Sequence, residues 1–206
     1  MPNWCLNKIK ISGNINNLYK LSQIFEKLKE QEDNDIGLME SLVGSDPSIS
    51  EEDYNNEGWF ESNINYWGTK WDVDYKEIIY INNNEFISLE FDTAWSPPVE
   101  FCELLSKKYG VSVKIKYIET GLAISGIYEI NDKGVVIRCE DYGNILEGIY
   151  QYDKSMFWDE IENRIEDNII DISKIDIENN QLFNNMPYLT KDDIIKFRNI
   201  IGKIIK

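Results

Sequence analysis

The first 140 residues alternate between segments with strand-like and segments with helix-like hydrophobic patterns. Alternation of apolar and polar residues, typical of half-buried strands, predicts strands at residues 8–12, 76–81, 86–91, 111–118, 122–130 and 135–139. Apolar residues at helical spacing predict an amphipathic helix over residues 17–30. A second helix is predicted over residues 97–109, with Ser96 as its N-cap and Gly110 as its C-terminal stop.

The order of these elements predicts the fold. Strand, helix, two strands, helix and strand follow one another, and further strands come after them. This is the order of a ferredoxin-like α+β fold, in which one antiparallel sheet packs two helices on a single face. We therefore predict a ferredoxin-like domain over residues 1–142 that carries an acidic insertion at about residues 30–66.

The rest of the chain has a helical pattern. Apolar stripes predict helices at residues 155–169 and 190–205, the second with Thr190 as N-cap and Asp193 three residues later in a capping box. Residues 143–206 are thus predicted to form a helical C-terminal extension, either a subdomain of its own or a cover over the open face of the sheet.

The negative charge of the chain is concentrated in two segments. The formal net charge is −16, from 21 Lys and Arg against 37 Asp and Glu. One segment, residues 139–178, holds twelve acidic residues against three basic ones. The other, residues 30–69, holds no Lys or Arg and contains Glu30, Glu32, Asp33, Asp35, Glu40, Asp46, Glu51, Glu52, Asp53, Glu57 and Glu61.

Such a distribution has two interpretations. Acidic loops keep proteins soluble, which is the more common role of surface charge. Alternatively, the acidic segment occupies a positively charged groove on a protein partner and displaces the nucleic acid bound there. A negative field repels nucleic acid, so direct nucleic-acid binding is not expected under either interpretation.

Composition argues against catalysis. The chain has no His, the commonest general base and a frequent transition-metal ligand, and it lacks phosphate-binding and dinucleotide-binding motifs. Its three cysteines, Cys5, Cys102 and Cys139, have no metal-binding spacing. We expect no cofactor and no metal. No apolar run approaches the length of about 20 residues needed to span a bilayer, and no export signal is evident. We therefore also expect no membrane association and a location in the bacterial cytoplasm.

Three tryptophan-containing stretches, together with 117–121 and 125–126, resemble a known family. The stretches are Met1-Pro-Asn-Trp-Cys5, Trp67-Gly-Thr-Lys-Trp-Asp-Val73 and Thr93-Ala-Trp-Ser-Pro-Pro98. In this order they are similar to the Api92-like, or YubB-type, ferredoxin-like domains of phages, plasmids and other mobile elements. The resemblance covers about residues 1–140 and implies a mobile-element origin and a ferredoxin-like fold, but no activity.

The same stretches suggest one candidate pocket, formed by Trp67, Lys70, Trp71, Asp72 and Trp95. A lysine between indole rings can make cation–π contacts and pair with an aspartate. Anchoring of a loop on the core is the more common role of such a cluster.

Two functions follow from these observations. The first is a non-catalytic accessory protein of a mobile element that binds a macromolecular partner, as an acidic nucleic-acid mimic that inhibits a host defence complex of the CRISPR type. The second is a small-ligand-binding or enzymatic domain with its pocket around Trp67, Trp71 and Trp95.

Overall fold

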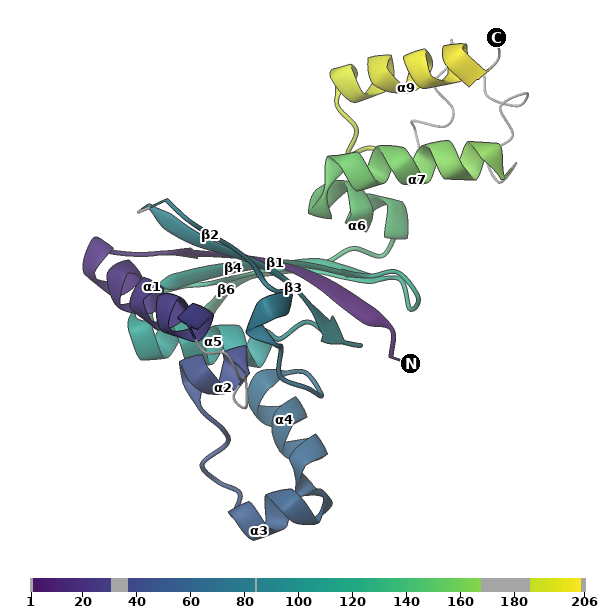
Figure 1. Cartoon of the computed structure of the whole chain (residues 1–206). Helices are drawn as coiled ribbons and strands as arrows, with labels where there is room; N and C mark the ends of the chain where they lie inside the picture. The colour runs from purple at the N-terminus through teal and green to yellow at the C-terminus, as the bar shows by residue number, and fades with distance from the viewer. Residues whose placement is uncertain (1, 31–36, 84, 168–185, 205–206) are drawn as a thin grey trace. The chain divides into compact units, whose positions relative to one another are not determined.

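The computed structural model describes residues 2–30, 37–83, 85–167 and 186–204 (Figure 1). The chain divides into two compact units, Met1–Ile145 and Leu146–Lys206. Within the described residues, no helix has the length and apolar character needed to cross a membrane.

The first unit is built on one antiparallel sheet of six strands. They are β1 (Trp4–Ser12), β2 (Ile79–Asn82), β3 (Phe86–Ala94), β4 (Ser112–Glu119), β5 (Ile124–Ile130) and β6 (Val136–Asp141). Their order in the sheet is β2-β3-β1-β4-β5-β6. The first four strands have the ferredoxin-like order, and β5 and β6 extend the sheet beyond β4, so the predicted fold is confirmed.

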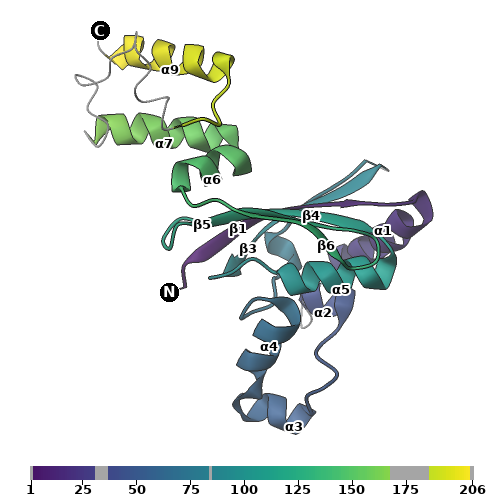
Figure 2. The ribbon, with the colours of Figure 1, turned by 180° about the vertical axis from the view of Figure 1, so that it is seen from behind.

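Two helices cover one face of the sheet, as predicted (Figure 2). α1 (Ile15–Glu30) and α5 (Val99–Tyr109) pack on alternate strand residues such as Ile9, Leu89 and Ile115, all of which are buried. The predicted stop at Gly110 is confirmed, because this residue has a φ of 62° and ends α5 in the left-handed conformation that glycine adopts readily.

The predicted start of α5 is wrong. The helix begins at Val99, and Pro98 in the N-cap position has no side-chain oxygen with which to cap it. The hydroxyl of Ser96 instead donates a hydrogen bond of 2.7 Å to the carbonyl oxygen of Gly68. This residue therefore ties the end of the insertion to the sheet.

The described part of the insertion is mostly helical, which the sequence pattern predicted only in part. The sequence favours a short turn of helix near residues 36–42, and α2 (Leu38–Val43) lies there. α3 (Glu51–Asp53), a π-helical turn (Tyr54–Gly58) and α4 (Trp59–Trp67) follow, and a 3₁₀ turn (Tyr75–Glu77) leads into β2. We refer to residues 37–67, from α2 to α4, as the acidic lobe.

The second unit contains α6, α7 and α9. Their bounds are Ile145–Tyr152, Lys154–Glu166 and Lys191–Ile204. α6 was not predicted, whereas the predicted capping box of α9 is confirmed: Thr190 N–H donates to Asp193 at 2.9 Å, and Asp193 N–H donates to Thr190 Oγ1 at 3.3 Å.

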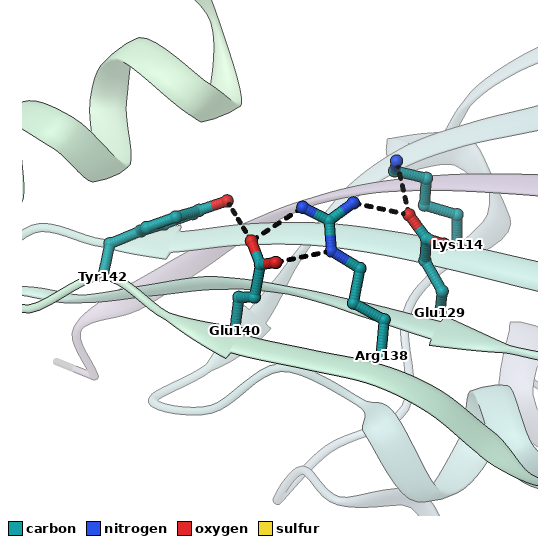
Figure 3. Close-up of polar contacts among 5 residues, drawn as sticks. All are labelled: Lys114, Glu129, Arg138, Glu140 and Tyr142. Atoms are coloured by element: carbon teal, nitrogen blue, oxygen red, sulfur yellow. Dashed lines mark hydrogen bonds and ion pairs between the residues drawn. The ribbon is translucent and has the colours of Figure 1, made fainter. Parts of the chain in front are cut away.

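On the sheet face opposite α1 and α5, a polar network crosses β4, β5 and β6 (Figure 3). Glu129 lies between Lys114 and Arg138 in the strand register and pairs with both, at 2.7 and 3.0 Å. Arg138 also pairs with Glu140 at 2.7 Å, and Tyr142 donates a hydrogen bond to Glu140 at 3.3 Å. Hydrogen bonding by Lys114 lowers the pKa of Glu129, which favours the charged form of this carboxylate.

Candidate functional site

The predicted acidic residues lie on several elements. Glu30 ends α1, Glu40 is in α2, Asp46 is in the loop that follows, and Glu61 is in α4. Glu51, Glu52 and Asp53 make up α3, and Glu57 lies in the π-helical turn. Glu32, Asp33 and Asp35 lie outside the described residues.

Part of the acidic lobe surrounds a hollow of about 430 Å³ between α2 and α3. Its lining residues are Glu40, Ser45, Asp46, Ile49, Ser50, Glu51, Tyr54 and Asn55. Three carboxylates, three hydroxyls and an amide give it a polar lining with an excess of negative charge. Such a surface attracts cationic groups.

The carboxylates of the lobe are held by neutral donors. Ser45 donates to Glu40 at 2.8 Å, and the hydroxyl of Ser48 donates to Asp46 at 2.7 Å, which lowers the pKa of Asp46. Ser50 donates to Asp53 at 2.6 Å. Among the described side chains of the lobe, no carboxylate is paired with Lys or Arg, so its negative charge is not neutralised locally.

Hydrogen bonds at the base of the lobe join its helices to one another and to α5. Within the lobe, Trp67 is buried, and its indole N–H donates to the carbonyl oxygen of Gly44 at 3.0 Å. The ammonium of Lys108 and the hydroxyl of Tyr109, both on α5, donate to the carbonyl oxygen of Leu42 at 2.7 and 2.8 Å. These bonds compensate exposed carbonyls at the C-terminal end of α2.

Asp72 fixes the other end of α2. Its carboxylate accepts hydrogen bonds from the backbone N–H groups of Met39 and Glu40 at 2.7 and 2.9 Å, and from its neighbour Val73 at 2.7 Å. Burial raises the pKa of Asp72, and the three N–H groups oppose that shift. This aspartate therefore orders the backbone at the start of the lobe.

The residues of the predicted pocket divide into two groups. Trp67 and Asp72 are occupied in the anchoring bonds described above. Lys70, Trp71 and Trp95 do come together: the Lys70 ammonium lies 4.5 Å from the ring centre of Trp71 and 5.0 Å from that of Trp95. The two indoles are stacked, with centres 6.3 Å apart.

Three further aromatic residues extend this cluster. Trp59 and Phe60, at the start of α4, lie 5.6 and 5.5 Å from the Lys70 ammonium. Trp4 packs on Trp71 with ring centres 6.4 Å apart. In the sequence, Trp4 contributed only to the resemblance to the Api92-like family and was not predicted to belong to the pocket. The signal available for Trp59 and Phe60 was an adjacent aromatic pair in an otherwise polar acidic segment.

Trp95 has a strained backbone. Its φ of 65° lies in the left-handed region, which costs a residue with a Cβ about 1–2 kcal/mol. A hydrogen bond of 2.9 Å from its N–H to the carbonyl oxygen of Asn3 holds this conformation. The indole is thereby turned outward and remains 39% exposed.

Glu119, Cys5 and Cys102 are buried ionisable groups of the first unit. Glu119 accepts hydrogen bonds of 2.7 Å from the N–H groups of Gly121 and Leu122, and so closes the turn after β4. Burial raises the pKa of the Cys5 thiol to about 12, and burial also raises that of Cys102, which disfavours the nucleophilic thiolate. Among the described residues, no His, Cys, Asp or Glu cluster is suited to hold a metal ion.

Comparison with known proteins gives one family and one related structure. Residues 66–155 match the model of the ferredoxin-like domain in Api92-like protein. A crystal structure of the protein api92 from Yersinia pseudotuberculosis is similar, with 11% sequence identity, a TM-score of 0.46, and coverage of 69% of this chain and 99% of that one. Comparison with curated proteins found no match.

Proposed function

Residues 66–155 belong to the ferredoxin-like domain family of Api92-like proteins, and we propose that the residues that carry this protein's function lie mainly outside them. The description of the family names a fold and no reaction. The acidic lobe, residues 37–67, precedes nearly all of it. In this proposal the protein is a non-catalytic accessory protein of a mobile element, and the lobe binds a protein partner.

One observation carries the proposal. The lobe combines seven acidic residues and no Lys or Arg with an ordered helical backbone that is hydrogen-bonded to α5 and to the segment before β2. Acidity that only improves solubility does not require such anchoring. A fixed array of carboxylates is suited to a partner with fixed positive charges, because complementary potentials provide specificity and speed association.

The partner class follows from the charge. Basic surfaces of the required size occur on proteins that bind nucleic acid, where they contact phosphates. The lobe competes for such a surface as a nucleic-acid mimic. A host defence complex of the CRISPR type is a partner with this chemistry, and blocking its nucleic-acid groove would benefit a mobile element.

A matched pair of variants tests the proposal. The lobe variant carries Glu51→Gln, Glu52→Gln and Glu61→Gln, and the control carries Asp159→Asn, Glu162→Gln and Glu166→Gln on α7. All six side chains are exposed, and each variant loses three negative charges. A difference in affinity between the two variants therefore results from where the charges lie and not from the net charge.

Binding to a purified CRISPR-type effector complex is measured with and without competing nucleic acid. We expect the lobe variant to bind at least about tenfold more weakly, the control to bind like the wild type, and added salt to weaken wild-type binding. Undiminished binding by the lobe variant contradicts the electrostatic mechanism. Failure of the wild type to bind contradicts this class of partner.

The aromatic cluster supports the second candidate, binding of a small ligand. The Lys70 ammonium lies near several exposed aromatic rings and, among the described residues, is not paired with a carboxylate. It can therefore receive an anionic group while Trp71 and Trp95 stack on a planar one. A thermal-shift screen with nucleotides tests this candidate, because a ligand at a hundredfold excess over its Kd adds about 2.7 kcal/mol to stability.

A further inference from the structure

A second hollow lies in the first unit, outside the acidic lobe. It has a volume of about 430 Å³, within the range of small-ligand pockets, and is lined by Trp4, Glu77 and Asp92. Trp4 begins β1, Asp92 is near the end of β3, and Glu77 ends the turn before β2. The neighbouring strands β1 and β3 are visible beside the N-terminus in Figure 1.

The strand register brings these residues to one place. Trp4 pairs with Ala94 and Leu6 pairs with Asp92, so Trp4 and Asp92 are diagonal neighbours. Both alternate with buried residues that face α1 and α5, and therefore project from the opposite face of the sheet. Glu77 adds a second carboxylate from the adjacent chain segment.

The two carboxylates are close enough to interact. Partial desolvation of its carboxyl raises the pKa of Asp92, although the residue lies at the surface, and the negative charge of Glu77 raises this pKa further. Within the described residues, neither side chain takes part in a hydrogen bond or an ion pair. A cation in the hollow would relieve this repulsion, whereas Glu40 and Asp53 of the lobe already accept hydrogen bonds from serines.

The third wall is an aromatic surface. Trp4 is 50% exposed, although its ring packs on that of Trp71. An exposed indole beside two carboxylates recognises an organic cation better than a metal ion, because the ring attracts the cation and covers its apolar part. Carboxylates alone would be the site for a hard cation such as Ca²⁺, which requires six to eight oxygen ligands.

We propose that this hollow binds the guanidinium group of an arginine side chain of a protein partner. A guanidinium is planar, so it can stack on Trp4 while its N–H groups pair with the carboxylates of Asp92 and Glu77. A lysine ammonium lacks this fork and stacks less well. This proposal rests on the proposed function, because it takes the partner to be a basic protein. It adds that one arginine side chain of that partner enters the hollow.

The test uses the whole chain and two small probes, N-acetyl-arginine amide and N-acetyl-lysine amide. Binding is followed by NMR through the indole N–H signal of Trp4, which is assigned by its loss in the Trp4→Phe variant. We expect the arginine probe to shift this signal in a saturable way. The lysine probe should bind several-fold more weakly.

Three variants decide between outcomes. Asp92→Asn and Glu77→Gln should each weaken arginine binding at least about tenfold, since one charge-assisted hydrogen bond accounts for that much affinity. The lobe variant with Glu51→Gln, Glu52→Gln and Glu61→Gln should bind the probe like the wild type. Because both carboxylates lie at the surface, their substitution should leave the fold intact, and the amide signals of the other residues verify this.

The proposal is overturned if the arginine probe fails to saturate at millimolar concentration, if the lysine probe binds equally well, or if the lobe variant loses as much affinity as Asp92→Asn. These results are independent of the proposed function. Loss of effector binding by the lobe variant and loss of arginine binding by Asp92→Asn are separate measurements, so either can fail alone.

Discussion

Replacing Asp72 by alanine should destabilise the first unit by about 2 kcal/mol, the upper end of the range for loss of a helix cap. The carboxylate accepts hydrogen bonds from the backbone N–H groups of Met39, Glu40 and Val73, and the methyl side chain of alanine cannot accept them. α2 also contributes buried residues, including Leu42, to the main core. Freeing the start of this helix therefore loosens the acidic lobe as well as the core.

Gly37 provides a second perturbation of the same contact. Its φ of −75° suits any residue, so alanine brings no backbone strain there. However, a Cβ on Gly37 would overlap the carboxylate of Asp72. Gly37→Ala should therefore cost about 1–3 kcal/mol, as overpacking does, by pushing the carboxylate from its three donors.

The two substitutions form a double-mutant cycle. In the Asp72→Ala background the overlap is gone, and Gly37→Ala should then cost much less, which leaves a coupling free energy of at least about 1 kcal/mol. Urea denaturation followed by circular dichroism measures all four proteins. An equal cost of Gly37→Ala in both backgrounds would refute the role given to Asp72.

Three further predictions concern other parts of the chain. Burial raises the pKa of Asp193, but hydrogen bonds from Thr190, Tyr150 and Lys154 outweigh this effect and lower the pKa to about 2. The charged carboxylate therefore stabilises the fold above pH about 4, and this stabilisation disappears as the pH falls toward about 2. In thermal melts, Asp193→Asn should thus be less stable than the wild type at pH 7, and this difference should vanish near pH 2. Gly68→Ala should cost at least about 1 kcal/mol in urea denaturation, because φ is 84° and the new Cβ would overlap Glu100. Glu140→Gln should hardly change the melting temperature, since exposed ion pairs contribute little.

The sheet was predictable because its strands have a simple alternating pattern. In β1 and β3, Ile9, Ile11, Ile87 and Leu89 face the core and alternate with polar residues. The same physics explains the order of strands and helices, since the apolar faces must cover one another. Local patterning thus determined most of the first unit.

α4 was missed because its inward face includes polar residues. Ser62 and Asn63 are buried, and they break the apolar spacing by which a helix is recognised. Their burial is compensated by partners outside the helix or in other turns: Ser62 donates to Asp46 at 3.4 Å, and Asn63 donates to the carbonyl oxygen of Lys70 at 3.0 Å and accepts from Tyr54 at 3.2 Å. Hydrogen bonds of this kind depend on the tertiary fold and leave no trace in a local pattern.

The candidate sites show the same division between local and tertiary information. Lys70 and Trp71 are adjacent in sequence, and a cation–π contact between them was predicted from that proximity. Trp4 and Asp92 are brought together only by the pairing of β1 with β3. The orientation of Asp72 toward α2 likewise depends on a segment more than thirty residues earlier in the chain.

The two acidic surfaces of the first unit differ in how their charges are arranged, and this difference suggests different roles. In the lobe, Glu40 and Asp53 accept hydrogen bonds from serines, so these carboxylates already have partners within the chain. Such charges act at a distance, mainly on the rate of encounter with a basic partner. Asp92 and Glu77 instead lie together in a hollow beside Trp4, where a cation would be partly desolvated and held in one orientation. Contacts of that kind act mainly on the rate of dissociation, so the lobe would attract the partner and the hollow would select it.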